Sequence, residues 1–181
     1  MKFTAIASAL LATAGLASAS VCKHPSPPTC TLSNDNLIGA NTDMSASQWN
    51  YQPIDSVPNL SHIQTCSGVA NGCALFYTNP LPYHVYFSYT FNNAIPGAKY
   101  TYTISVLLED AGLSQDIVLS NDGSSETSTT TVPATANAAP ISLEFTAASS
   151  TVVLYVDAQN VYAGGLRFGN PSIVQTSCAP N

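Results

Sequence analysis

Two runs of alternating residues constrain the fold more than any other feature of this chain. His84 to Phe91 (HVYFSYTF) and Lys99 to Leu108 (KYTYTISVLL) place apolar or aromatic residues at every second position. Successive side chains of an extended strand point to opposite faces, so each run presents one apolar face to a core. Both runs are rich in the β-branched and aromatic residues that favour strands. The alternation predicts two long β-strands joined by a turn at residues 92–97.

Shorter segments carry the same signal. The further candidate strands are Asn36 to Ile38, Gln48 to Tyr51, Ala74 to Thr78, Leu113 to Ser120, Thr127 to Val132, Ile141 to Phe145, Thr151 to Asp157 and Leu166 to Gln175. Thr127 to Val132 is Thr-rich and typical of a sheet edge. Thr151 to Asp157 is apolar enough to be covered on both faces. Leu166 to Gln175 is expected to be broken at Asn170-Pro171. From residue 32 onward the sequence has no convincing helical pattern. It has about nine or ten candidate strands, with turns every ~8–12 residues. This pattern predicts an all-β antiparallel β-sandwich of jelly-roll type over residues 32–178.

The N-terminal residues are predicted to direct the chain out of the cell. A positive start at Met1-Lys2 precedes an apolar stretch, and Ala17-Ser18-Ala19 supplies the small residues that signal peptidase reads. The alternative is a membrane anchor, but the apolar stretch is shorter than the ~20 residues of a span and no basic cluster follows it. We expect a signal peptide over residues 1–19, a Pro-rich arm over residues 20–31, and a secreted protein that is extracellular or cell-wall associated.

The charge balance restricts the partners. Ten acidic residues outnumber four basic ones, and only Lys23, Lys99 and Arg167 are basic beyond the predicted signal peptide. Binding to nucleic acid or to an anionic membrane requires clustered lysine and arginine, so neither is expected. Charged residues make up 8% of the chain, and the polar surface must therefore come from hydroxyl and carboxamide side chains, which suit neutral polysaccharides. We expect a monomer.

Five cysteines favour disulfide bonds in a secreted protein. Cys66 and Cys73 bracket a turn-rich hexapeptide, and Cys30 and Cys178 flank the first and last candidate strands, so both pairs are predicted to bond. Cys22 is an alternative partner for either Cys30 or Cys178, because Cys22 and Cys30 flank a Pro-rich loop, and one of the five cysteines must remain unpaired. No cysteine or histidine has the spacing of a metal site. The sequon at Asn59 lies in a loop-like segment, where we expect N-glycosylation in a eukaryotic host.

The order of these segments resembles the galactose-binding-like jelly roll of carbohydrate-binding modules, of the fungal secreted type. The resemblance rests on the opening Asn36-Leu37-Ile38-Gly39-Ala40, on Ser47-Gln48-Trp49-Asn50, on the strand after Ile95-Pro96-Gly97 and on the closing Phe168-Gly169-Asn170-Pro171-Ser172-Ile173. It spans residues 32–176. The resemblance implies a sandwich that binds a neutral glycan without catalysis.

The resemblance also implies a structural calcium ion between the opening loop and the closing strand. In this chain Ala40 and Asn170 stand near the positions where the family carries carboxylates. Asp35 and Asp43 are the remaining candidate ligands, since calcium prefers carboxylate oxygens. We expect no cofactor, with structural calcium as the alternative.

A sugar site needs an aromatic face to stack on the ring and polar groups to bind its hydroxyls. The hypothesis is one site near the end of the chain, because loops of a rigid sandwich commonly carry binding residues. Its predicted ligand-binding residues are Asp157, Gln159, Asn160, Tyr162 and Arg167, with Tyr83 in a Pro-rich turn as a further stacking candidate. The alternatives are a structural salt bridge between Arg167 and Asp157, and core positions for the tyrosines. Tyr162→Ala is predicted to weaken binding without unfolding the protein.

Catalysis is not expected. A glycosidase needs two carboxylates across a cleft, whereas Glu109 and Asp110 are typical of a hairpin turn and Glu144 of an outward strand position. The G-x-S-x-G elbow of serine hydrolases is missing from the sequence. The main alternative to glycan binding is a secreted structural or protein-interaction role, because a fold alone does not fix a function.

Overall fold

The computed structural model describes the chain from residue 30 to residue 180 with gaps. The described residues are 30–32, 34–39, 44, 48–52, 59–63, 69, 72–77, 82–110, 112–135, 137–162 and 164–180. The predicted signal peptide, most of the Pro-rich arm, and the residues Cys22, Ala40, Asp43 and Cys66 lie outside them. Within the described part, no helix is both long and apolar enough to span a membrane.

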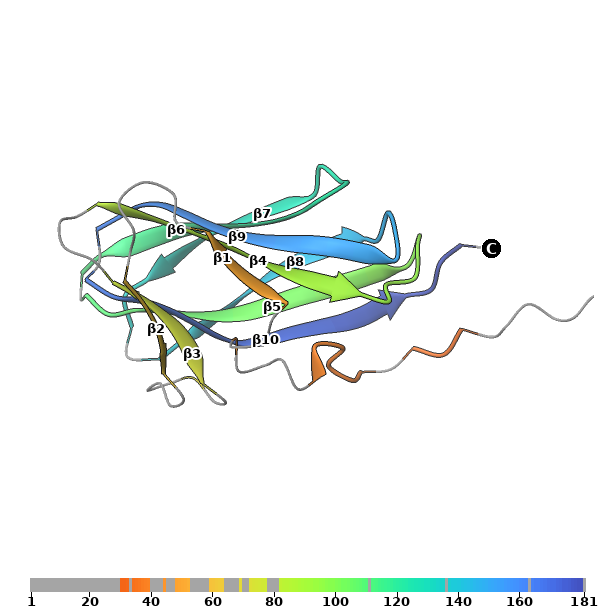
Figure 1. The fold of residues 1–181 in the computed structure, drawn as a ribbon, viewed down its shortest axis with the longest axis horizontal. Coiled ribbons are helices and arrows are strands. Elements are labelled where there is room, and N and C mark those ends of the chain that lie inside the picture. The colour runs from red at the N-terminus through yellow and green to blue at the C-terminus, as the bar shows by residue number, and fades with distance from the viewer. Residues whose placement is uncertain are drawn as a thin grey trace, which may run out of the picture.

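The described part of the chain contains ten strands. They are β1 (Trp49–Gln52), β2 (Asn59–Ile63), β3 (Cys73–Tyr77), β4 (Tyr83–Asn92), β5 (Lys99–Leu108), β6 (Ser114–Asn121), β7 (Thr127–Pro133), β8 (Ala139–Thr146), β9 (Thr151–Val161) and β10 (Leu166–Ser177). They form two antiparallel sheets that pack face to face (Figure 1). The first sheet has the order β1-β4-β9-β6-β7, and the second has the order β2-β3-β10-β5-β8. The predicted all-β antiparallel sandwich is confirmed, and the Thr-rich β7 lies at an edge as predicted.

The alternation of apolar residues places the core between the sheets. Phe87 of β4 in the first sheet meets Phe76 of β3 and Phe168 of β10 in the second, with ring centroids 5.6 and 5.0 Å apart. Trp49 is 6% exposed, and its ring packs at a tilt against Tyr89 with ring centroids 4.7 Å apart, so it belongs to the core. Both sheets therefore keep their second faces for solvent or for partners.

Several predicted boundaries are wrong, and each error has a local cause. The last strand is continuous through Asn170-Pro171, because a β-bulge between Gly169 and Ser172 absorbs the interruption. β9 continues to Val161 and is covered on one face only, since alternate residues such as Tyr155 remain half-buried. Asn59 opens β2 instead of lying in a loop, because residues 59–63 pair with β3.

Asn36 to Ile38 is a turn and not a strand, because the Asn36 carboxamide satisfies main-chain groups that a strand would pair. Its Oδ1 accepts hydrogen bonds from the Ile38 and Ile173 amides at 3.1 and 3.0 Å. Its Nδ2 donates to the Pro171 carbonyl at 3.0 Å. Asn170 within the β10 bulge has φ 48°. Asn36 therefore holds the opening segment against the bulge, at the place where the family resemblance puts calcium.

Asn36→Ala is expected to lower the free energy of unfolding by about 2 kcal/mol, because three partly buried hydrogen bonds are lost. Asn36→Asp keeps the accepting oxygen and is expected to cost about 1 kcal/mol. Urea unfolding monitored by circular dichroism measures both, with the exposed Asn34→Ala as the control. Equal stability of Asn36→Ala and wild type would contradict this role of Asn36.

Tyr102 buries its hydroxyl in the core without a hydrogen-bond partner among the described residues. Burial raises the pKa of Tyr102 above the ordinary value of 10.0, and the phenols of Tyr51 and Tyr89 raise it further. Burial also raises the pKa of Tyr83, with smaller contributions from Asp110 and Glu109. Above pH 10 the phenols of Tyr83 and Tyr102 therefore lose their protons in the unfolded chain but keep them in the folded chain.

The free energy of unfolding is therefore expected to fall as the pH rises above 10, because the unfolded state then binds fewer protons. Tyr102→Phe is expected to flatten this decline and, at pH 7, to be neutral or stabilising by about 1 kcal/mol, since it removes an unpaired buried hydroxyl. Tyr83→Phe is the contrasting variant, because the Tyr83 hydroxyl donates to the Phe76 carbonyl at 3.2 Å. Urea unfolding between pH 7 and 11 measures the effect, and an unchanged slope in Tyr102→Phe would contradict it.

A disulfide joins Cys30 to Cys178 across 148 residues and ties the opening segment to the end of β10. Cys73 is also disulfide-bonded. The pairing of Cys73 with Cys66 stays a prediction, because Cys66 lies outside the described residues. Disulfides are typical of proteins outside the reducing cytosol.

Candidate functional site

The outward side chains of the first sheet form a surface that we call the tyrosine face. The inward positions of β4 and β9 are buried, so the alternate residues point away from the core. The strand register sets Asp157 between Tyr86 and Val118, and Tyr155 between Ser88 and Ser120. The tyrosine face comprises Asn50, Gln52, His84, Tyr86, Ser88, Thr90, Asn92, Asp116, Val118, Ser120, Thr127, Thr129, Thr131, Thr151, Val153, Tyr155, Asp157 and Gln159.

Tyr86 and Tyr155 lie at the centre of this face. Their rings stack with centroids 5.7 Å apart and planes inclined by 20°, and both side chains are half-buried. Partial burial raises the pKa of Tyr86, followed by the effects of Tyr155 and Asp157. Because they belong to neighbouring strands, the two rings form one aromatic platform on rigid elements.

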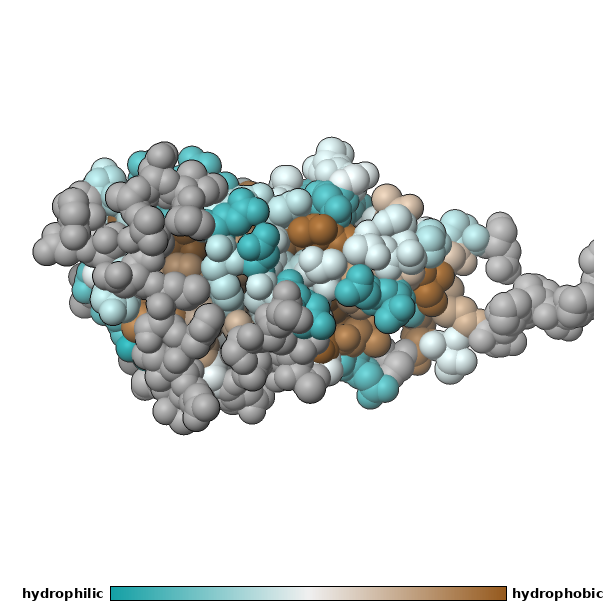
Figure 2. All heavy atoms as spheres, viewed as in Figure 1, coloured by the Kyte–Doolittle hydropathy of each residue, from teal (hydrophilic) through white to brown (hydrophobic). Residues whose placement is uncertain are grey.

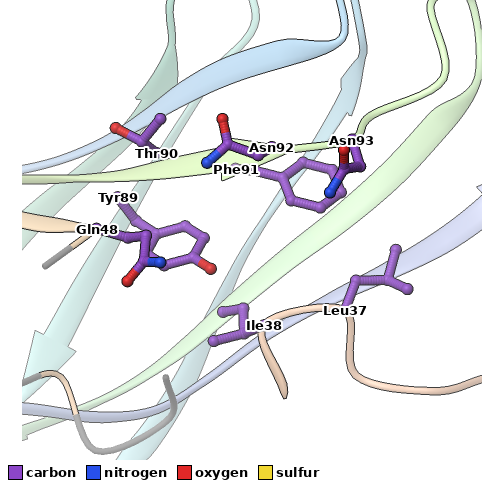
Figure 3. Close-up of a pocket in the computed structure, with 8 residues that line it drawn as sticks. All are labelled: Leu37, Ile38, Gln48, Tyr89, Thr90, Phe91, Asn92 and Asn93. Atoms are coloured by element: carbon purple, nitrogen blue, oxygen red, sulfur yellow. The ribbon is translucent and has the colours of Figure 1, made fainter. Parts of the chain in front are cut away.

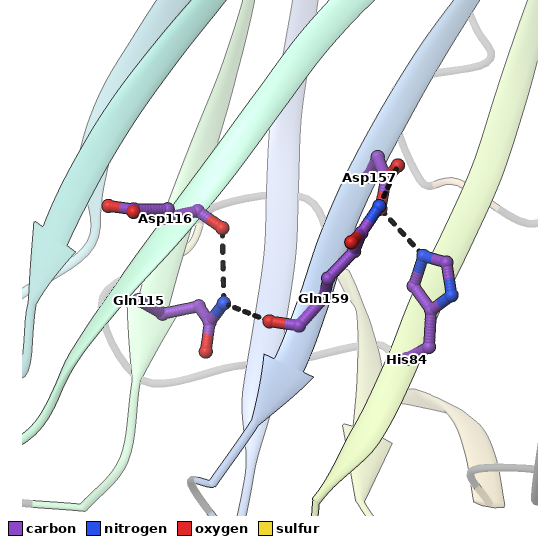
Figure 4. A network of polar contacts seen from close by, with 5 residues as sticks. All are labelled: His84, Gln115, Asp116, Asp157 and Gln159. Carbon is purple, nitrogen blue, oxygen red and sulfur yellow. Dashed lines mark hydrogen bonds and ion pairs between the residues drawn. The ribbon is translucent and has the colours of Figure 1, made fainter.

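A polar chain borders the platform on one side. His84 Nε2 lies 2.6 Å from Asp157 Oδ1, and the Gln159 carboxamide donates to Asp157 Oδ2 at 3.2 Å (Figure 4). The His84 ring also meets the edge of Tyr86 at 6.3 Å. Asp157 is thus held in place by two partners beside the tyrosine stack.

A bulge in β9 shapes this end of the face. Val85 pairs with Ala158 whereas Tyr83 pairs with Val161, so β9 has one extra residue there. Asn160 takes the left-handed conformation with φ 52°, which asparagine tolerates better than most residues. The Gln115 carboxamide donates to the carbonyls of Gln159 and Asp116 at 2.8 and 3.1 Å (Figure 4). It fixes the bulge to β6.

The structure brings together four of the six predicted ligand-binding residues. Asp157 and Gln159 share the tyrosine face, Asn160 is exposed in the bulge, and Tyr162 follows β9 with 58% of its surface exposed. The alternative of a core position is therefore wrong for Tyr162. Whether these residues bind a ligand stays a prediction.

Arg167 lies on the opposite side of the sandwich. Leu166 and Phe168 are buried, so Arg167 points outward from the second sheet, and it forms an ion pair with Glu109. The proposed salt bridge with Asp157 is wrong, because β9 and β10 belong to different sheets. Grouping Arg167 with Asp157 in one site is wrong for the same reason.

Tyr83 is a strand residue and not a turn residue. It opens β4, is 3% exposed and donates its hydroxyl to the Phe76 carbonyl. It offers no ring face to a ligand in this structure. The expected turn ends one residue earlier, because Tyr83 already pairs with Val161.

Sequence reasoning assigned only Asp157 and Gln159 of the tyrosine face to a site, and it missed the central residues His84, Tyr86 and Tyr155. Tyr86 occupies an outward position of the alternating run His84 to Phe91, and this signal was sufficient to place it on a surface. Tyr155 lies in the segment that was expected to be covered on both faces, so the sequence did not mark it as a surface residue. The contact between His84 and Asp157 depends on the pairing of β4 with β9, for which the sequence carries no local signal.

The chemistry of the tyrosine face is that of a neutral binding surface. Its hydrogen-bonding groups are mainly hydroxyls and carboxamides, and its described residues include neither lysine nor arginine. Lys99 and Arg167 both belong to the second sheet. Among the described residues, no group of three or more His, Cys, Asp or Glu side chains suits a metal ion, so structural calcium stays an untested alternative.

Comparison with solved structures identifies the architecture. The chain superposes on the CBM22-1 xylan-binding domain of Paenibacillus barcinonensis Xyn10C with a TM-score of 0.59 and 11% identity, over 83% of this chain and 100% of that one. It matches TmCBM61 in complex with β-1,4-galactotriose with a TM-score of 0.57 and 10% identity, over 78% and 99%. It also matches the enzymatically active domain of bacteriophage CBA120 tailspike protein 4 (TM-score 0.56, 10% identity) over 77% of this chain, but spans only 21% of that one.

These likenesses establish the fold, a CBM22-like jelly roll. The predicted resemblance to carbohydrate-binding jelly rolls is confirmed at that level, whereas the fungal type is not tested. By sequence, the chain matches no family model and no curated protein.

Proposed function

We propose that this protein is a secreted, non-catalytic module that binds a neutral extracellular or cell-wall glycan on the tyrosine face. The observation that carries the proposal is the stack of Tyr86 on Tyr155, bordered by hydroxyl and carboxamide groups. Aromatic rings pack against the apolar faces of sugar rings, and the polar border supplies partners for sugar hydroxyls.

The electrostatics favour a neutral ligand over an anionic one. Asp116 and Asp157 are acidic members of the face, and its described residues include no lysine or arginine to offset a uronic acid. The fold similarity supports the same class, since the solved structures include a xylan-binding domain and a module in complex with β-1,4-galactotriose.

Binding to polysaccharides tests the proposal. The disulfide-intact protein is incubated with insoluble xylan, β-1,4-galactan, cellulose, chitin and β-glucan, and with polygalacturonate as an anionic control. Saturable binding to at least one neutral polymer, and weaker binding to polygalacturonate, is the expected result. Failure to bind any neutral polymer would favour the alternative of a secreted structural or protein-interaction role.

Tyr162→Ala tests how far the binding surface extends along β9. Because Tyr162 follows Gln159 and Asn160 and is 58% exposed, its removal is expected to weaken binding about fivefold without changing the melting temperature. Tyr77→Ala is the matched control, since Tyr77 is 42% exposed on the second sheet. If Tyr162→Ala binds the polymer with unchanged affinity, the glycan-binding surface does not extend beyond the end of β9.

A further inference from the structure

A pocket of about 220 Å³ lies at the far end of β4 from His84. Residues 89–93 form one wall, Gln48 before β1 contributes to the rim, and Leu37 and Ile38 close the opposite side (Figure 3). β1 begins at Trp49, which pairs with Tyr89, so the residues of β4 after Tyr89 have no partner in β1. The Thr90 amide donates a hydrogen bond to the carbonyl of Gln48, the residue before β1. The pocket thus opens at an edge of the sandwich. Figure 2 shows hydrophobic residues exposed between hydrophilic ones on the face of the molecule that it presents.

The described residues that line the pocket carry no charge. Gln48 and Asn93 supply two carboxamides and Tyr89 supplies a hydroxyl, whereas the side chains of Thr90 and Asn92 point to the other side of β4, toward the tyrosine face (Figure 3). Leu37, Ile38 and Phe91 supply the apolar part. Five of the eight described lining residues are polar and none is charged, and such a lining suits a small uncharged ligand that forms many hydrogen bonds.

Much of this hydrogen-bonding capacity is unused. The side chains of Gln48 and Asn93 and the Tyr89 hydroxyl make no hydrogen bond to another described residue, whereas Asn92 Oδ1 accepts only a long bond of 3.4 Å from Thr151. Figure 3 shows the Gln48 and Asn93 carboxamides and the Tyr89 ring around the same opening. Tyr89 is 4% exposed, so its ring is fixed by the core.

We infer that this pocket is a separate binding site for one neutral sugar residue, either a free monosaccharide or the end of a glycan chain. Its volume is below the ~300 Å³ of typical drug-sized sites, which limits the ligand to one small ring. The carboxamides match sugar hydroxyls as both donors and acceptors. An anionic sugar is disfavoured, because the described lining has no cation. This inference does not depend on glycan binding by the tyrosine face.

The test is a titration of the ¹⁵N-labelled, disulfide-intact protein with D-xylose, D-galactose and D-glucose up to about 100 mM, because one-ring ligands bind at roughly millimolar Kd. The expected result is a saturable shift of the side-chain NH₂ signals of Gln48 and Asn93 with at least one sugar. D-glucuronate is expected to bind at least about tenfold more weakly than D-glucose. No saturable shift with any neutral sugar, or equal binding of glucuronate, would overturn the inference.

Two variants separate the pocket from the tyrosine face. Asn93 has φ 66°, so Asn93→Gly removes the carboxamide in a backbone conformation that glycine adopts freely. Gln48→Ala removes the second carboxamide and keeps the main-chain bond to Thr90. Each is expected to weaken monosaccharide binding about tenfold, whereas Tyr77→Ala, which removes an exposed tyrosine from the second sheet, leaves it unchanged. Wild-type affinity in both pocket variants, or loss of monosaccharide binding in Tyr77→Ala, would overturn the assignment to this pocket.

Discussion

Replacing Tyr86 and Tyr155 together by alanine is expected to weaken polysaccharide binding about thirtyfold or more, which corresponds to a loss of about 2 kcal/mol. The two rings stack at 5.7 Å on the tyrosine face and form its aromatic platform. Losses of this size are typical of central aromatic residues in binding sites. Affinity gel electrophoresis or titration calorimetry with the polymer that wild type binds measures the change.

Two controls separate the loss of a binding surface from the loss of stability. The double substitution to phenylalanine keeps both rings and is expected to retain most of the affinity. Tyr77→Ala removes an exposed tyrosine from the second sheet and is expected to leave binding unchanged. Full affinity of the folded double-alanine variant would show that the tyrosine face is not the binding surface.

Removing the Cys30–Cys178 disulfide is expected to cost about 5 kcal/mol of unfolding free energy, because the bond closes a very long loop. The cysteines are 148 residues apart, and the bond connects the opening segment to the end of β10. Replacing both cysteines by serine leaves the separate disulfide of Cys73 in place. Urea unfolding of the double variant measures the loss.

Loss of this disulfide is expected to exceed the effect of Asn36→Ala, although both changes act on the opening segment. Asn36 contributes three hydrogen bonds to the folded state, whereas the disulfide also restricts the unfolded chain. A loss below about 1 kcal/mol in the double serine variant would contradict the entropic argument.

The long strands were predictable because their signal is local. Lys99–Leu108 has the same bounds in the sequence pattern and in β5, since alternation over ten residues leaves little ambiguity. β2 (Asn59–Ile63) was missed, because five residues with mixed polarity give no clear period. Tyr83 was assigned to a turn because the preceding Pro80-Leu81-Pro82 dominated the pattern, whereas pairing with β9 extends β4 to include it.

The site was less predictable, because it depends on which strands share a sheet. Asp157 and Arg167 are close in sequence, but consecutive strands β9 and β10 lie in opposite sheets and their outward residues face opposite directions. The partners of Asp157 come instead from β4 and from its own strand. Non-local pairing of this kind has no signature in residue spacing.

Nuclear magnetic resonance mapping of a bound oligosaccharide is the most direct test of the tyrosine face. The ¹⁵N-labelled protein is titrated with xylohexaose and with β-1,4-galactotriose, and the backbone amide shifts are followed. Glycan binding on the tyrosine face predicts saturable shifts concentrated in β4, β9 and β6, including Tyr86 and Tyr155, with β3, β10 and β5 unchanged. Shifts concentrated on the second sheet, or no shift with either oligosaccharide, would contradict it.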